Sequence, residues 1–188
     1  MRLFAAAWPP AGVRRSLARL PRPDVPGLRW TTTDQWHVTL AFYGEVPEEE
    51  LPALAGPLGR AAMSVPGPPV ATVGDRTLLL GRDALCLPVS GLDLLAGTVR
   101  EATLPWVRNG PGFTGHLSLA RAGRGREVPA CLVDVPLPAG GGGGSRGRGA
   151  PAVSWAVEEV CLAVSTASPD GSRYRIATSA PVGPGGAP

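Results

Sequence analysis

The sequence contains no lysine, so all 18 of its cationic side chains are arginine. It is also rich in glycine and proline, with 26 and 22 residues, and G- and C-rich codons account for both biases. Arginine nonetheless suits phosphate better than lysine does, because its planar guanidinium can bind two oxygens at once. The net charge of +3 permits a nucleic-acid partner without requiring one.

Cysteine is scarce, and long hydrophobic runs are missing. The three cysteines lie far apart and form neither a CxxC pair nor a Cys/His cluster of the kind that binds zinc. The apolar run at 3–8 stops at Pro9 and is too short for a signal-peptide core, and no segment is long enough to span a bilayer. We therefore expect a cytoplasmic monomer with no metal, no cofactor and no membrane contact.

The remaining pattern predicts one globular domain over residues 1–179. Strands are expected at 2–8, 37–43, 70–74, 77–81, 84–89, 116–121, 153–165 and 173–178, and helices after Pro10, at 48–63 with a kink or early end at Pro57, and at 91–103. Because similar blocks recur around two similar motifs, the pattern favours an α+β fold of two related lobes. The glycine-rich segment 139–150 is predicted to be a flexible loop, and residues 180–188 a disordered tail.

The only two histidines stand in a repeated motif. One copy reads HVTLAFYG from His37 and the other HLSLARAG from His116, so both fit H-x-[ST]-L-A-x-x-G. Residues i and i+2 of a strand point to the same face, so each imidazole shares a face with a hydroxyl, that of Thr39 or of Ser118. Two such strands brought together would line a cleft with two imidazoles and two hydroxyls.

This set of side chains suits acid–base chemistry at phosphorus. Histidine is the one side chain that titrates near neutral pH without perturbation, and hydroxyls can donate to the non-bridging oxygens of a phosphate. An in-line displacement needs a base for the nucleophile and an acid for the leaving group, which two imidazoles supply without a metal. A lone histidine on such a strand is more often structural, but the duplication favours catalysis. Two histidines alone are a poor metal ligand set.

The motifs resemble those of the two-histidine phosphoesterase superfamily, and within it the bacterial RNA 2′,3′-cyclic phosphodiesterases, also called 2′-5′ RNA ligases. The resemblance covers most of the chain: MRLFAA at 1–6, WHVTLAFYGEV at 36–46, FTGHLSLAR at 113–121, and the segments 155–165 and 171–174. Two residues depart from the family pattern. Ser118 stands where threonine is usual, and Gly115 where proline is frequent.

The resemblance implies a bilobed fold with two pseudo-symmetric lobes, whose antiparallel sheets line a central cleft. The implied reaction is metal-independent hydrolysis of an RNA terminal 2′,3′-cyclic phosphate to a 2′-phosphate, with 2′-5′ ligation as a possible side activity. In that scheme His37 is the proton donor to the departing O3′, and His116 is the proton acceptor that activates water. The near symmetry of the repeat leaves the reverse order open.

Three further side chains are candidates for contact with the substrate. The resemblance suggests Arg121 as a phosphate ligand, although strand parity at +5 from His116 turns it away from the cleft unless a bulge intervenes. Tyr43 shares the parity of His37, and Trp36 precedes that histidine. Either aromatic ring could stack on a base or pack in the core.

Two other functions compete with hydrolysis of RNA 3′ ends. One is a two-histidine enzyme for small cyclic nucleotide phosphates such as ADP-ribose cyclic phosphate, which would need a closed pocket instead of an open cleft with an arginine rim. The other is a non-catalytic module that binds RNA ends. Two intact motifs argue against the module, because a pure binder has no use for two titratable bases.

Overall fold

The computed structural model describes residues 1–108, 112–137, 153–168 and 171–184. Its strands are β1 (Arg2–Ala7), β2 (Leu28–Trp30), β3 (Val38–Glu45), β4 (Val70–Val73), β5 (Leu78–Leu80), β6 (Ala84–Ser90), β7 (His116–Ala122), β8 (Ser154–Ala156), β9 (Glu159–Ser168) and β10 (Gly171–Pro181). The helices are α1 (Ala11–Leu17), α2 (Leu51–Ser64) and α3 (Asp93–Ala102), with 3₁₀ turns η1 (Thr33–Gln35), η2 (Glu48–Glu50) and η3 (Ala130–Leu132).

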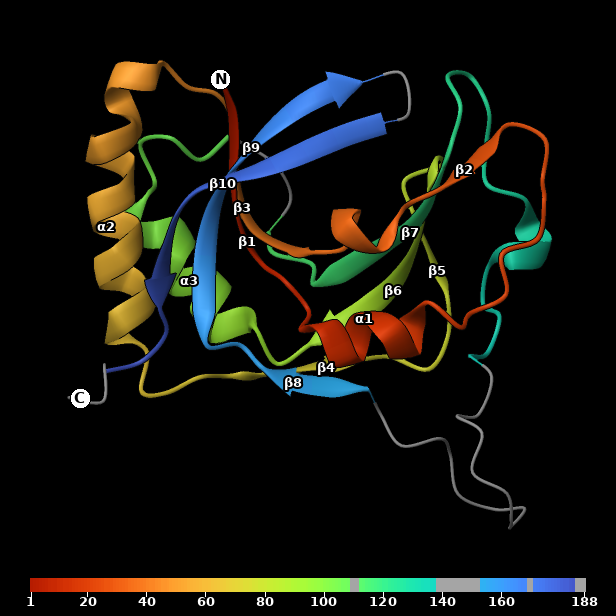
Figure 1. Cartoon of the computed structure of the whole chain (residues 1–188), viewed down its shortest axis with the longest axis horizontal. Coiled ribbons are helices and arrows are strands. Elements are labelled where there is room, and N and C mark those ends of the chain that lie inside the picture. Colours follow the sequence, from red (N-terminus) through yellow and green to blue (C-terminus); the bar gives the residue numbers. More distant parts are fainter. Residues whose placement is uncertain (109–111, 138–152, 169–170, 185–188) are drawn as a thin grey trace, which may run out of the picture.

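The strands form two antiparallel sheets, and each sheet carries one histidine motif. The first has the order β10-β9-β1-β3, and the second has the order β2-β7-β6-β4-β8 with β5 paired to β6. Figure 1 shows α2 and α3 together on one side of the molecule and β2, β5, β6 and β7 on the other, with the first sheet between them. The predicted α+β fold with antiparallel sheets is confirmed.

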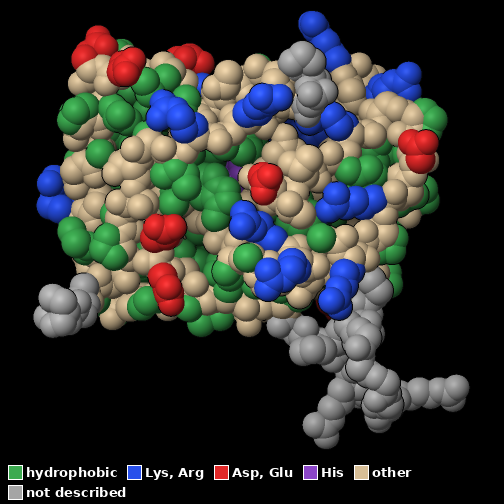
Figure 2. Space-filling model, viewed as in Figure 1, with side chains coloured by type: hydrophobic (Ala, Val, Ile, Leu, Met, Phe, Trp, Pro, Cys, Tyr) green, Lys and Arg blue, Asp and Glu red, His purple; other side chains and the backbone are tan. Residues whose placement is uncertain are grey.

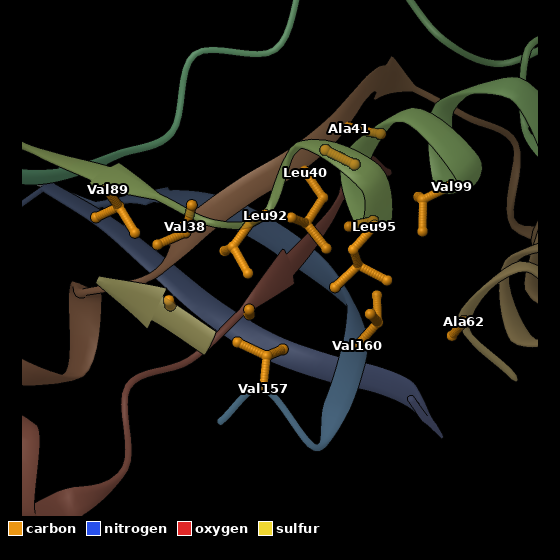
Figure 3. Packing of buried hydrophobic residues seen from close by; sticks show 14 of the residues in the cluster. Val38, Leu40, Ala41, Ala62, Val89, Leu92, Leu95, Val99, Val157 and Val160 are labelled. Carbon is orange, nitrogen blue, oxygen red and sulfur yellow. The ribbon is translucent and has the colours of Figure 1, made fainter. Parts of the chain in front are cut away.

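The main core lies between the first sheet and helices α2 and α3. At α3, Leu92, Leu95 and Val99 recur at the spacing of one helix face, and all three are buried. Figure 3 shows this face directed at Val38 and Leu40 of β3. The motif strand β3 is therefore held from behind by a helix, which leaves its other face for the site.

Two expectations about local structure need correction. Pro57 does not end its helix early, because α2 continues through it to Ser64. The tail is not disordered from residue 180, because β10 runs to Pro181, and the amide of the buried Val182 donates to Glu158 O at 2.8 Å. Pairing with β9 therefore orders the chain further than its glycine and proline content suggests.

The predicted glycine-rich loop at 139–150 and the last four residues lie outside the described residues. Among the helices that the structure describes, none is long and apolar enough to cross a membrane.

Candidate active site

A pocket of about 110 Å³ opens between the two motifs. Its lining is mostly polar and comprises Arg29, Thr31, Gln35, His37, Thr39, His116, Ser118, Arg121, Ser172 and Tyr174. Both imidazoles, both motif hydroxyls and Arg121 therefore meet in one place, from segments 79 residues apart. In Figure 2 a small area of histidine surface is visible near the middle of the face, with basic side chains gathered on the β2–β7 side.

Each motif strand carries a β-bulge at the same position of the repeat. In β3 the pairing with β1 passes from Ala41 to Thr39 in one step, so Leu40 is the extra residue. In β7 the pairing with β6 passes from Ala120 to Ser118, so Leu119 is extra. A bulge shifts the side-chain alternation by one residue. The residue at +5 from each histidine therefore returns to the site face.

The two imidazoles are held by equivalent hydrogen bonds. Nδ1 of His37 lies 2.8 Å from Gln35 O, and Nδ1 of His116 lies 2.8 Å from Thr114 O. A carbonyl oxygen only accepts, so Nδ1 carries the proton in both rings, and Nε2 of each ring is the nitrogen available to a substrate. Gln35 also ties this turn to the first sheet, because its side-chain amide donates to Ser172 O at 2.7 Å.

His37 is enclosed by aromatic rings. The ring centroids of Phe4, Trp8 and Tyr174 lie 4.8, 5.3 and 4.8 Å from that of His37. Burial lowers the pKa of His37 from 6.5 to about 4, and the positive charges of His116 and Arg121 add to this, whereas the hydrogen bond to Gln35 opposes it. His37 is therefore neutral at pH 7 in the free protein.

The surroundings of His116 are polar and basic. Arg29 of β2 pairs directly with Arg121 of β7, so the two guanidinium groups stand on one face of the sheet. Arg121 also contacts Asp83 at 3.3 Å. Just before His116, the backbone of Gly115 passes so close to β6 that a Cβ there would overlap Val89 O, which explains why this chain has glycine at that position.

Comparison with known proteins agrees with this fold. The family model for LigT-like phosphoesterases matches residues 8–74. The crystal structure of TT0787 of Thermus thermophilus is 26% identical, with a TM-score of 0.75 over 97% of this chain and 98% of that one. Apo LigT of E. coli is 28% identical, with a TM-score of 0.70 over 96% of each chain. The resemblance to the LigT-like phosphoesterases is confirmed.

This resemblance supports a phosphoesterase activity for the chain. Crystal structures of E. coli LigT have been determined in complex with phosphate, 3′-AMP and NADP⁺. A search of curated protein sequences finds no match to this chain.

The prediction that Tyr43 or Trp36 stacks on a base is wrong. Tyr43 and Trp36 are 0% and 1% exposed and cannot reach a base. The bulge at Leu40 explains why Tyr43 is buried. It turns the Tyr43 ring into the core, where its hydroxyl lies 3.1 Å from Thr103 Oγ1. Phe42 takes the outward position, with the guanidinium of Arg2 over its ring.

Sequence reasoning missed several lining residues that lie far from the motifs along the chain. Arg29 and Thr31 come from a segment without a predicted element, although LRW at 28–30 between Gly27 and the threonines is a short strand signal. Tyr174 lies on a predicted strand, but the sequence gives it no role. No local signal shows that its ring meets His37 edge-on.

Within the described parts of the chain, no three His, Cys, Asp or Glu side chains are grouped so that they could hold a metal ion. The pocket offers two imidazoles and two hydroxyls instead, which is a donor set for an anion.

Proposed function

We propose that the chain hydrolyses a terminal 2′,3′-cyclic phosphate on RNA to a 2′-phosphate, by paired acid–base catalysis without a metal. The observation that carries this proposal is the meeting of two Nδ1-anchored imidazoles and two motif hydroxyls in a single pocket. A cyclic phosphate needs a proton taken from water on one side and a proton given to the departing oxygen on the other. Two imidazoles that line one pocket, each with its Nε2 left available, match that requirement.

The surroundings of the histidines support a definite assignment of roles. A base must be neutral before the reaction, and the aromatic enclosure keeps His37 neutral at pH 7. We therefore reverse the order implied by the resemblance, so that His37 is the proton acceptor and His116 the proton donor. His116 then makes the second proton transfer, from the strand that also carries Ser118 and Arg121.

Nε2 of His37 takes a proton from water as the water oxygen attacks phosphorus. The bond from phosphorus to O3′ breaks, and O3′ receives the proton from Nε2 of His116. The product carries a 2′-phosphate, and the two imidazoles have exchanged protonation states, which solvent restores.

The remaining polar side chains are suited to the charge of the phosphate. Thr39 and Ser118 stand beside the histidines and can donate to the non-bridging oxygens, where charge grows in the transition state. The guanidinium groups of Arg29 and Arg121 add positive charge to the lining of the pocket. Tyr174 is the aromatic ring that borders the pocket, so it replaces Tyr43 and Trp36 as the ring nearest the substrate.

Small cyclic nucleotide phosphates are a second candidate substrate. A pocket of about 110 Å³ has room for a phosphate and part of a ribose, so the rest of any RNA would lie outside it. LigT, a structural relative, has been crystallised with 3′-AMP and NADP⁺, which are small nucleotides. If contacts outside the pocket contribute little, a mononucleotide will be as good a substrate as an oligonucleotide.

The test is to incubate the protein in EDTA with an oligonucleotide that ends in a 2′,3′-cyclic phosphate, and to identify the product. The proposal predicts a 2′-phosphate end, formed by the wild type and lost in His37→Ala and His116→Ala. A 3′-phosphate product, or a requirement for added divalent metal, would contradict it. Comparing kcat/KM with that for 2′,3′-cyclic AMP separates the two substrate classes.

A further inference from the structure

The two half-sites are joined by a buried hydrogen-bond relay through one hydroxyl, that of Thr31. Nε1 of Trp36, the residue before His37, donates to Thr31 Oγ1 at 2.8 Å. On its other side, Thr31 Oγ1 lies 2.8 Å from both Ser118 O and Leu119 O, to which it can donate its single proton. Thr31 N also donates to Leu119 O at 2.8 Å. Thr31 is only 8% exposed.

The hydrogen-bond partners of Thr31 lie at the two histidine motifs. Ser118 and Leu119 are the residues at which β7 bulges, and that bulge turns Arg121 toward the pocket, to the face that Ser118 shares with His116. At the other end, the indole of Trp36 is 1% exposed and fixed beside the first histidine. One hydroxyl thus bonds to the backbone of the second motif and to the side chain that precedes the first.

We propose that Thr31 is a positioning residue, whose hydroxyl sets the spacing and orientation of the two histidine motifs relative to each other. This inference rests on the proposed function, because alignment matters only if both motifs act on one substrate. Its hydroxyl has its donor and its acceptor roles filled within the protein, so Thr31 acts through the motifs and not on the phosphate. A displacement of about 1 Å in such a site can lower a rate on the order of 10²-fold.

The chain offers a matched control in its other buried threonine. Thr103 is 0% exposed, and its Oγ1 also links an aromatic side chain to a backbone carbonyl, with Tyr43 Oη at 3.1 Å and Val99 O at 2.7 Å. It joins α3 to β3 in the core and does not line the pocket. Thr103→Val therefore removes a similar buried hydroxyl without touching the link between the motifs.

The experiment measures kcat and KM on the cyclic-phosphate oligonucleotide for Thr31→Val, Thr31→Ser and Thr103→Val, below the unfolding temperature of each. We expect Thr31→Val to lower kcat between about tenfold and 10²-fold and also to raise KM, because misaligned motifs hold the phosphate less tightly as well as transferring protons more slowly. Thr31→Ser keeps the hydroxyl and should restore kcat to within about threefold of the wild type. Trp36→Phe removes the indole donor from the other end and should reproduce the loss if Thr31→Val fails to fold.

A double-mutant cycle separates positioning from general destabilisation. In a His116→Ala background there is no second imidazole to align, so Thr31→Val should cost little more. The inference would be overturned if the losses of Thr31→Val and His116→Ala multiplied in the double variant. It would also be overturned if Thr31→Val had the kcat of the wild type, or if Thr103→Val lost as much activity as Thr31→Val.

Binding of inorganic phosphate by calorimetry gives a readout that does not depend on turnover. Weaker phosphate binding in Thr31→Val but not in Thr103→Val would support the inference. It would do so even if the wild type did not hydrolyse the cyclic phosphate, because that lack of hydrolysis would refute only the proposed function. Unchanged phosphate binding in Thr31→Val would overturn the inference, whether or not the wild type is active.

Discussion

Around His37 the rings of Phe4, Trp8 and Tyr174 exclude water, whereas His116 stands on β7, the strand that also carries Arg121 and that pairs with Arg29 of β2. Both halves nevertheless share the same strand motif, the same bulge at the motif leucine and the same Nδ1 hydrogen bond to the carbonyl two residues earlier. The shared features aim two Nε2 atoms into one pocket. Burial keeps the His37 ring neutral, and on our proposal this divides one repeated motif into two chemical roles.

The comparison predicts that neither half can replace the other. His37→Ala and His116→Ala should each lower kcat by roughly 10²–10⁴-fold, because each removes one of the two proton transfers. The double variant should be little worse than the poorer single one, since the two groups act as a unit. Rates measured on the cyclic-phosphate oligonucleotide in EDTA test this. A double variant whose loss is the product of the two would show that the histidines act independently.

The motif hydroxyls should behave alike in the two halves. Thr39→Val and Ser118→Ala each remove a donor to the phosphate and should cost on the order of tenfold in activity. Thr39→Val is nearly isosteric, so it tests the hydroxyl and not the packing. Circular dichroism confirms the fold of each variant, and wild-type turnover in either would make that hydroxyl structural.

Arg121 belongs to one half only and should have a smaller effect, mainly on KM. Because it already contacts Asp83 and is partly exposed, Arg121→Ala should raise KM by several-fold up to about tenfold. Arg82→Ala is the matched control, since Arg82 is an exposed arginine paired with Glu127 and does not line the pocket. Equal effects of the two substitutions would remove Arg121 from the site.

The aromatic enclosure of His37 also has a consequence for stability. Its pKa falls from 6.5 to about 4 on folding, so between these values the unfolded chain binds a proton that the folded protein does not. Stability should therefore fall as the pH drops from 6.5 to 4, by up to about 3 kcal/mol from this group. Urea unfolding of the wild type and of His37→Gln at about pH 7 and pH 4.5 measures it, with His116→Gln as the control. A pH dependence in His37→Gln as large as that of the wild type would contradict the assignment.

The sequence alone shows the motifs, most strands and the pairing of each imidazole with a hydroxyl, because all of these follow from local periodicity. It fails where an extra residue interrupts the period. The bulges at Leu40 and Leu119 reverse the parity beyond them, which buries Tyr43 and brings Arg121 to the pocket. The aromatic neighbours of His37 come from two distant segments, Phe4 and Trp8 from β1 and the residue after it and Tyr174 from β10, so their contact with it depends on tertiary structure.

The most direct test of the division of roles uses a substrate in which sulfur replaces O3′ of the cyclic phosphate. A thiolate leaves without protonation, since a thiol has a pKa of about 8.5, so the acid becomes dispensable and the base does not. We predict that His116→Ala regains activity to within about tenfold of the wild type on this substrate, whereas His37→Ala stays impaired. Recovery of His37→Ala instead, with His116→Ala still impaired, would contradict the account.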